Sequence, residues 1–363
     1  MKKILSRVIL PFLGLGCMIA SCDDWTDLEP QIKENLLESN KTPEYYEQLR
    51  AYRKSDHPIA FGWFGNWSGK GASLVNCMAG LPDSVDVISM WGGWKNPTEN
   101  MLRDLRLVQQ QRGTKALVCF IVLEMGDQIT PTEHAGSRDD RHKFWGWVDG
   151  DEEAIRASIV RYANAVCDTI DKYNYDGFDL DWEPSYAQPF ETNKEMAYNG
   201  RIALFIETLS KRIGPASGTG RILAIDGEPE HSEIPAEMGK YFDYFISQAY
   251  AATGESGLNN RLNRVISHYK GVLTPEECAA KFVVCENFES YAQTGGVSFT
   301  TPDGKVVRSV EGMARWNPVI NGRKVRKGGV GTFHMEYEFT VSGKEGTYPF
   351  LRNAIQIMNP SVK

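Results

Sequence analysis

YDGFDLDWEP, which runs from Tyr175 to Pro184, carries more structural information than any other segment of this 363-residue chain. Its acids Asp179, Asp181 and Glu183 alternate with apolar side chains, and a period of two places all three acids on one face of a β-strand. The other face is apolar and suits packing under helices, which predicts a strand inside a covered sheet. The alternative is an edge strand with a solvated acidic face.

A row of carboxylates on one strand face has a chemical consequence. Like charges a few Å apart cannot all stay ionised, so the pKa of at least one acid rises and that acid keeps its proton. Glu183 ends the row, Asp181 beside it raises its pKa by repulsion, and Asp179 can share a proton with Asp181. The row therefore suits a general acid whose titration is coupled to its neighbours.

The rest of the chain alternates strand-like and helix-like segments. Apolar periodicity at helical spacing favours helices over Thr98–Gln111, Glu152–Tyr173, Met196–Ile213, Arg261–Tyr269 and Tyr348–Met358. Eight short runs rich in β-branched and aromatic residues are expected as buried strands: Ile59–Gly65, Val85–Trp91, Lys115–Leu123, Gly177–Trp182, Ile222–Asp226, Tyr244–Tyr250, Lys281–Glu286 and Gly329–Met335. Eight strands separated by helices predict an α/β fold, a (β/α)8 TIM barrel, in one domain over 56–363. Thr300–Lys327 is expected to form a long hairpin or loop.

The acidic spacing resembles the D-x-x-D-x-D-x-E signature of glycoside hydrolase family 18, with Asp176 in its first position and Gly177 next. The resemblance implies the same barrel, with the site at the C-terminal ends of the strands. It implies Glu183 as acid/base, while Asp181 orients the 2-acetamido group of the substrate and Asp179 completes the catalytic row. That acetamido group then acts as the nucleophile, an exception to the two-carboxylate scheme.

The resemblance also implies a tyrosine at the end of the sixth strand whose hydroxyl bonds the acetamido oxygen. Tyr250 matches that place, and Gln248 shares its strand face. The alternative for Tyr250 is a core tyrosine at a strand end.

Other residues expected at the strand ends could bind sugar or simply line the barrel mouth. Family chitinases carry a tryptophan late in the eighth strand, whereas Gly331–Met335 has none. This departure favours an endo-β-N-acetylglucosaminidase acting on N-glycans over a chitinase. The substrate-binding candidates are Asp176, Gln248, Trp63, Asn66, Trp91, Glu228, Glu286, Asn287 and Met335.

The resemblance therefore predicts hydrolysis in the N,N′-diacetylchitobiose core of N-glycans, with a glycan or glycoprotein as partner. Two alternatives stay open: a surface glycan-binding protein without turnover, and chitinase-like hydrolysis. The four motif acids are all present, which favours an enzyme.

The N-terminus resembles a bacterial lipoprotein signal. A basic start precedes the apolar stretch Val8–Ile19, which is too short to span a bilayer comfortably, and small residues lead to Cys22. We expect cleavage of residues 1–21, lipid on Cys22 and a tether over 22–55 with a short helix near Thr42–Lys54. An ordinary signal peptide is the alternative. The acids after Cys22 resemble the surface-export signal of Bacteroidetes lipoproteins, so an outer-membrane anchor facing outward is expected.

Composition excludes several classes. Lys and Arg number 40 against 47 acids, and a net charge of −7 disfavours nucleic acid as a partner. Cysteines outside the N-terminal segment show no C-x-x-C spacing, so neither a disulfide framework nor a metal site is expected. We expect a monomer that needs no cofactor.

Overall fold

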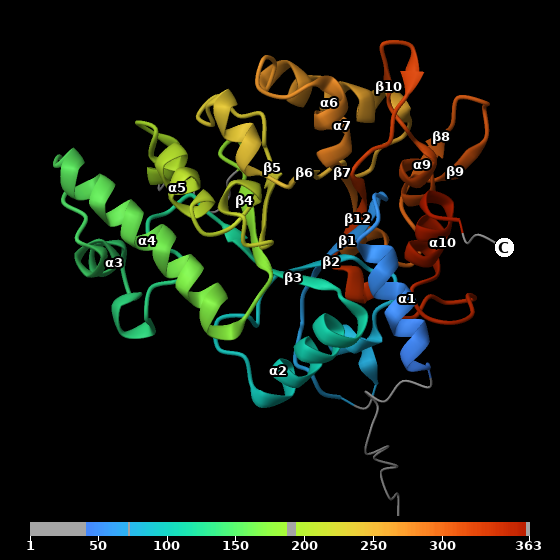
Figure 1. The fold of residues 1–363 in the computed structure, drawn as a ribbon, viewed down its shortest axis with the longest axis horizontal. Helices are drawn as coiled ribbons and strands as arrows, with labels where there is room; N and C mark the ends of the chain where they lie inside the picture. Colours follow the sequence, from blue (N-terminus) through green and yellow to red (C-terminus); the bar gives the residue numbers. More distant parts are fainter. Residues whose placement is uncertain (1–40, 72, 187–193, 361–363) are drawn as a thin grey trace, which may run out of the picture. The chain divides into compact units, whose positions relative to one another are not determined.

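The computed structural model describes residues 41–71, 73–186 and 194–360. Eight parallel strands close into a barrel in the order β1-β12-β7-β6-β5-β4-β3-β2, which confirms the predicted TIM barrel (Figure 1). Residues 1–21 and Cys22 lie outside the described residues. The barrel strands are β1 Ile59–Phe64, β2 Val87–Met90, β3 Lys115–Ile121, β4 Gly177–Trp182, β5 Ile222–Gly227, β6 Tyr244–Ser247, β7 Phe282–Asn287 and β12 Gly329–Phe333.

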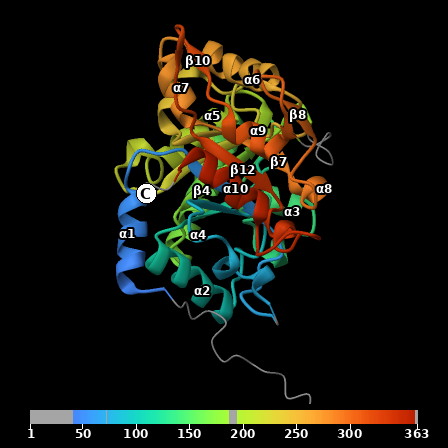
Figure 2. The same cartoon turned by 90° about the vertical axis from the view of Figure 1, so that its right-hand side faces the viewer.

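Helices surround the barrel (Figures 1 and 2). The longest, α4, begins after an Asp151 side chain that accepts from the Ala154 amide, and it ends where Asn174 turns left-handed. No helix in the described ranges has the length and apolarity needed to cross a bilayer. The helices are α1 Pro43–Arg53, α2 Glu99–Arg106, α3 Arg138–Trp145, α4 Glu152–Tyr173, α5 Arg201–Ser210, α6 Glu255–His268, α7 Pro275–Lys281, α8 Phe288–Tyr291, α9 Ser309–Arg315 and α10 Pro349–Met358.

β4 is held tightly against β5. Gly177 begins β4 with φ of +150°, and a Cβ there would lie 1.9 Å from the Ile222 carbonyl oxygen of β5. Only glycine tolerates both the dihedral angle and the approach. The outward side chains Phe178 and Leu180 join the apolar layer under the helices, which leaves the acids on the inner face.

Two apolar clusters fill the fold. The larger one lies between the strands and the helices, and the smaller one fills the barrel interior with Phe61, Leu117, Ile246 and Val283 among its members. The interior is thus a packed core up to the level of the acids, so chemistry is confined to the mouth.

The predicted hairpin or loop over Thr300–Lys327 contains a helix as well. It holds α9 between two short hairpins, β8–β9 (Ser298–Thr300 and Val306–Arg308) and β10–β11 (Val319–Ile320 and Arg323–Lys324). The second hairpin lies beside α7, where Asn321 donates to Glu276 at 3.3 Å (Figure 2). The segment after β3 also contains a helix: Trp145 ends α3, and both Trp145 and Trp147 are buried.

The predicted helix near Thr42–Lys54 is present as α1 and is bonded to the barrel. Arg53 donates to the Asp86 carboxylate and to the Arg112 carbonyl, both at 2.7 Å, and Arg50 donates to the Gln111 carbonyl at 2.8 Å. These acceptors precede β2 and β3. Therefore α1 closes the end of the barrel where the strands begin.

Candidate active site

β4 presents its acids to the inside of the barrel, as the alternation predicts. Asp179 and Asp181 are 0% and 3% exposed, whereas Glu183, directly after the strand, is half-buried and borders a cavity. Depth thus differs along the row: Asp179 lies below the cavity, Asp181 is buried in its floor, and Glu183 stands at its edge.

Asp226 of β5 extends this row sideways. It is paired in register with Asp181, is 1% exposed and accepts from Gln248 Nε2 at 2.8 Å. Sequence reasoning missed Asp226 and chose Glu228 as the acid of this strand end. One feature of the sequence could have identified Asp226: it is an acid near the end of an otherwise apolar strand that neighbours β4.

The four acids titrate as one group. Burial raises the pKa of Asp179 to about 6 and raises the pKa of Asp181 and of Asp226 well above the ordinary value, with neighbouring acids adding to the last two. Burial also raises the pKa of Glu183, opposed by a hydrogen bond from Gln248 and assisted by the charge of Glu228. Each buried aspartate keeps one oxygen with no donor within the described residues, which fits protons held by the acids themselves.

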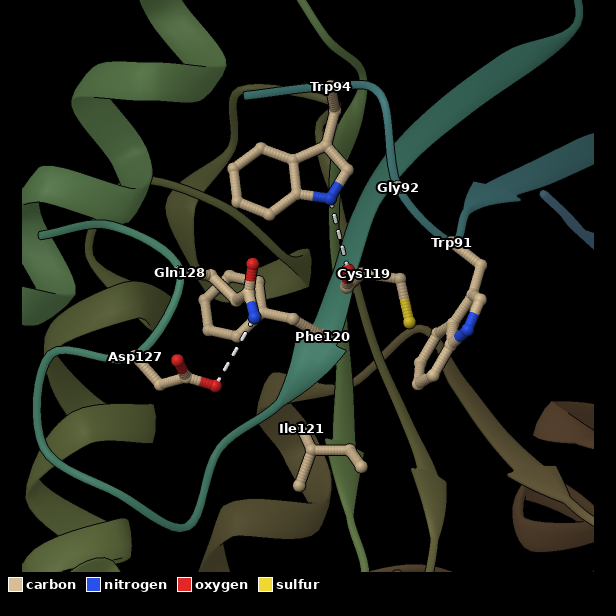
Figure 3. Close-up of a pocket in the computed structure, with 8 residues that line it drawn as sticks. All are labelled: Trp91, Gly92, Trp94, Cys119, Phe120, Ile121, Asp127 and Gln128. Carbon is tan, nitrogen blue, oxygen red and sulfur yellow. Dashed lines mark hydrogen bonds between the residues drawn. The ribbon is translucent and has the colours of Figure 1, made fainter. Parts of the chain in front are cut away.

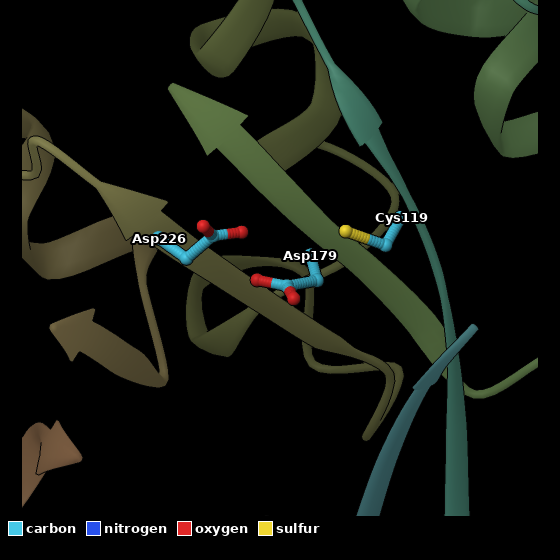
Figure 4. A group of neighbouring side chains, drawn as sticks. All are labelled: Cys119, Asp179 and Asp226. Atoms are coloured by element: carbon cyan, nitrogen blue, oxygen red, sulfur yellow. The ribbon is translucent and has the colours of Figure 1, made fainter. Parts of the chain in front are cut away.

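Ligand-type side chains of this group lie close enough to consider a metal. Cys119, Asp179 and Asp226 place ligand atoms within 4.8 Å of one another, and so do Asp181, Glu183 and Asp226 (Figure 4). However, burial and the adjacent acids raise the pKa of the Cys119 thiol well above its ordinary value. A cysteine ligand must be a thiolate, so a cation could bind the first of these two groups only by displacing the proton of Cys119.

Gln248 and Tyr250 reach the site from the end of β6. The strand stops at Ser247, three residues before the predicted end, yet both side chains border the same cavity as Glu183. Gln248 Nε2 donates to Glu183 as well as to Asp226. This amide therefore fixes the orientation of the glutamate relative to the acids below it.

The central cavity, as we call the space of about 280 Å³ bordered by Asp181, Glu183 and Tyr250, has aromatic walls. The predicted residues Trp63, Trp91 and Asn287 lie in its wall. Phe333 ends β12 where no tryptophan was found, and its ring centroid lies 6.0 Å from Trp63, 5.8 Å from Trp91 and 6.2 Å from Tyr250. Apolar ring faces of this kind suit the C–H face of a sugar.

A second cavity of about 300 Å³ adjoins the central cavity and shares Trp91 and Ile121 with it (Figure 3). Its floor includes Phe120, and Gln128 donates to Asp127 at its edge at 3.4 Å. The mouth thus continues from the acids toward the segments after β2 and β3.

Asp176 and Met335 do not lie in the central cavity, contrary to the prediction. Asp176 precedes β4 at the opposite end of the barrel and accepts from Lys115 Nζ and from the Ala116 amide, both at 3.0 Å. Its place in the motif is structural. Met335 is fully buried against β1, where a Cβ added at Gly62 would lie 2.6 Å from its sulfur.

Three other candidates are bonded to protein rather than lining the central cavity. Asn66 Nδ2 donates to Glu336 at 3.3 Å, and Glu228 accepts from the amide and hydroxyl of Ser185. Glu286 is fully buried and accepts from the Ala251 amide at 2.8 Å, directly after Tyr250. Glu286 therefore positions the segment that carries Tyr250.

Comparison with known proteins fits this geometry. The profile described as glycoside hydrolase family 18, BT1044-like, matches residues 24–357. The chain belongs to glycoside hydrolase family 18. The solved structure of a selenomethionine BT1044 variant is 32% identical, with a TM-score of 0.75 over 90% of this chain and 97% of that one.

Two further similar proteins carry a shared name. Endo-β-N-acetylglucosaminidase F2 of Elizabethkingia meningoseptica is 24% identical over 329 residues, which are 86% of this chain and 85% of that protein. The structure of an endo-β-N-acetylglucosaminidase of Cordyceps militaris is 21% identical with a TM-score of 0.60, over 89% of this chain and 98% of that one, and shows the shared fold. This family 18 chain is therefore a glycoside hydrolase.

Proposed function

We propose that this family 18 enzyme is an endo-β-N-acetylglucosaminidase that hydrolyses the β-1,4 bond in the N,N′-diacetylchitobiose core of N-glycans. The observation that carries the proposal is the meeting of Glu183, Asp181 and Tyr250 in one aromatic-walled cavity. The name of the Elizabethkingia relative, which matches along most of its length, supports the same class of substrate.

Glu183 is the proton donor in this proposal. It is the least buried acid of the row and borders the cavity, and burial raises its pKa, which favours the protonated form that a donor needs. As the glycosidic bond breaks, the leaving oxygen takes the proton of Glu183. The resulting carboxylate then removes a proton from the water that completes hydrolysis.

The nucleophile is the 2-acetamido oxygen of the substrate. It attacks the anomeric carbon and forms an oxazoline, which water opens with overall retention. Asp181 orients the acetamido nitrogen, and the Tyr250 hydroxyl donates to the acetamido oxygen. Asp181 and Asp226 are poor nucleophiles themselves because they are buried and their raised pKa values favour the neutral form.

The test is incubation with a high-mannose glycoprotein, a complex-type glycoprotein and a chito-oligosaccharide, followed by mass spectrometry of released glycans. We expect release from at least one glycoprotein, with one N-acetylglucosamine left on the polypeptide. Glu183→Gln should lower release by roughly a hundredfold to ten-thousandfold. Cleavage of the chito-oligosaccharide alone would support a chitinase. Glycan binding by the wild-type protein without any release would support a binding protein.

A thiazoline mimic of the oxazoline tests the nucleophile. Strong inhibition is expected if the acetamido group attacks, because the mimic resembles the intermediate. A covalent glycosyl adduct on an aspartate or glutamate would contradict the proposed mechanism.

We also propose that the chain is held to the outer membrane by lipid on Cys22 and faces the exterior. The basic and apolar N-terminal residues before Cys22 support this proposal.

A further inference from the structure

A larger cavity of about 660 Å³ lies next to the central cavity, between the segments that follow β4 and β5 and the helix α6. We call it the flank cavity; Ser185, Glu228, Glu230, Arg261 and Arg264 are in its wall. In the described part of the chain it shares no wall residue with the central cavity.

The wall of the flank cavity includes residues that lie close to Glu183, the proposed proton donor. Ser185 follows Glu183 by two residues, and Gly227, also in the wall, is so close that an added Cβ would lie 2.7 Å from Glu183 Cγ. The left-handed φ of +82° at Gly227 also favours glycine there. The flank cavity therefore lies directly beside the stem of Glu183.

One guanidinium in the wall has no direct hydrogen-bond partner. Glu228 accepts from the Ser185 amide at 3.0 Å and hydroxyl at 2.8 Å, and Glu230 accepts from Arg264 Nε at 2.7 Å. Arg261 makes no hydrogen bond or ion pair with the described residues; it is half-buried, burial lowers its pKa, and the charge of Glu230 partly opposes that shift. An arginine stays charged in proteins, so its five N–H donors are available to a ligand in the cavity.

We propose that the flank cavity receives the leaving-group side of the substrate and that Arg261 binds a carboxylate there. The inference rests on the proposed function, in which Glu183 protonates the leaving oxygen, so the departing part must lie against Glu183. For a glycoprotein that part is one N-acetylglucosamine with its polypeptide. The planar fork of arginine matches a carboxylate in two parallel hydrogen bonds. The carboxylate is that of an acidic side chain near the glycosylated residue.

The test compares two glycopeptides with the same glycan that differ by one Asp-to-Asn exchange close to the glycosylated residue. Wild-type kcat/KM should be roughly fivefold to tenfold higher for the acidic peptide, as expected for one partly solvated charge-assisted contact. Arg261→Gln should bring the ratio close to one, and Arg261→Lys should restore part of it. Arg315→Gln on α9, whose partner is Glu311, is the matched control and should keep the wild-type ratio.

A sialylated glycan on the neutral peptide separates the two sources of a carboxylate. A preference for sialylated over desialylated substrate that depends on Arg261 would place the carboxylate on the glycan and overturn the leaving-group assignment. A wild-type ratio near one for the two peptides would overturn the inference altogether.

Binding distinguishes a failure of this inference from a failure of the proposed function. Calorimetry with Glu183→Gln protein and peptides carrying a single N-acetylglucosamine needs no turnover. If no glycopeptide is cleaved but the acidic peptide still binds more tightly through Arg261, the cavity assignment stands without the activity. Equal binding of both peptides would overturn the cavity assignment whatever the activity.

Discussion

At the level of single residues, burial separates two kinds of acid in one row. Asp179 lies beneath the cavity, Asp181 and Asp226 are buried in its floor, and Glu183 lies at its edge. Burial makes the ionised form of each aspartate costly, so the pKa of all three is raised. Their preference for the neutral form costs folding stability when the pH rises.

Asp179→Asn should make stability less dependent on pH. The folded pKa of Asp179 is about 6, above its ordinary value of 3.8, so its neutral form is favoured in the folded state. Its stabilising contribution is full below the unfolded pKa and is lost as the pH rises through about 6. We expect the Tm of the wild type to fall between about pH 4 and pH 6 more steeply than that of the variant.

Thermal unfolding at several pH values measures this effect, with Asp139→Asn on the exposed start of α3 as the control. Parallel pH curves for wild type and Asp179→Asn would show that Asp179 is ionised in the folded protein.

Tyr250→Phe should lower turnover on N-glycans far more than it weakens binding. The hydroxyl bond to the acetamido oxygen strengthens as charge develops during ring closure, so its loss acts on kcat. Removing one such donor costs roughly a hundredfold to a thousandfold in kcat. Steady-state kinetics beside calorimetry on the Glu183→Gln background separates the two effects. Equal losses in binding and turnover would assign Tyr250 a general contact instead.

At the level of elements, the sequence predicted those strands and helices that have a clear hydrophobic periodicity. All eight buried strands and the long helix α4 were predicted; the bounds of α4 agree with the structure, whereas β6 and β12 end before their predicted ends. The short helix α9 was missed because seven residues with Gly312 inside give little helical signal. Asp176 was placed in the site by motif membership alone, although it stands three residues before Asp179 and so cannot share its strand face. Met335 was predicted as the last residue of the eighth strand, but β12 ends at Phe333.

Hydrogen bonds between side chains explain why the predicted site residues differ from those found in the central cavity. Which acid at the end of β5 borders the central cavity depends on its contacts: Asp226 accepts from Gln248, whereas Glu228 accepts from Ser185. No periodicity encodes that choice. It follows from the packing of two neighbouring loops.

Gly177→Ala should destabilise the barrel strongly. Its Cβ would overlap the Ile222 carbonyl of β5 in addition to the unfavourable φ, so we expect a loss of roughly 3 kcal/mol or more in the free energy of unfolding. Gly150→Ala is the control because φ is +83° there but no atom lies within 4 Å, and its cost should be about 1 kcal/mol. Chemical denaturation measures both, and equal costs would refute the close contact between β4 and β5 as the cause.

At the level of the whole molecule, the proposed anchor and the proposed activity belong to different parts of the chain. Cys22→Ala should leave the protein unlipidated and move it from the membrane fraction to the soluble fraction, with activity on free glycoprotein unchanged. Cell fractionation and immunoblotting measure the shift, and Cys77→Ala, at a buried free thiol, is the control. A membrane-bound Cys22→Ala protein would point to another anchor.

The contacts of α1 set the direction in which a tethered barrel points. Because Arg50 and Arg53 fasten this helix where the strands begin, the polypeptide enters the barrel at the end opposite the acids. In a protein held to a surface through its N-terminal segment, the point of attachment to the barrel would therefore not obstruct the mouth. Bulky glycoproteins could then approach without steric conflict with lipid headgroups or surface polysaccharide. The rate at which the enzyme binds glycoproteins would then depend on how often they reach the mouth from solution, rather than on their diffusion within the crowded surface layer.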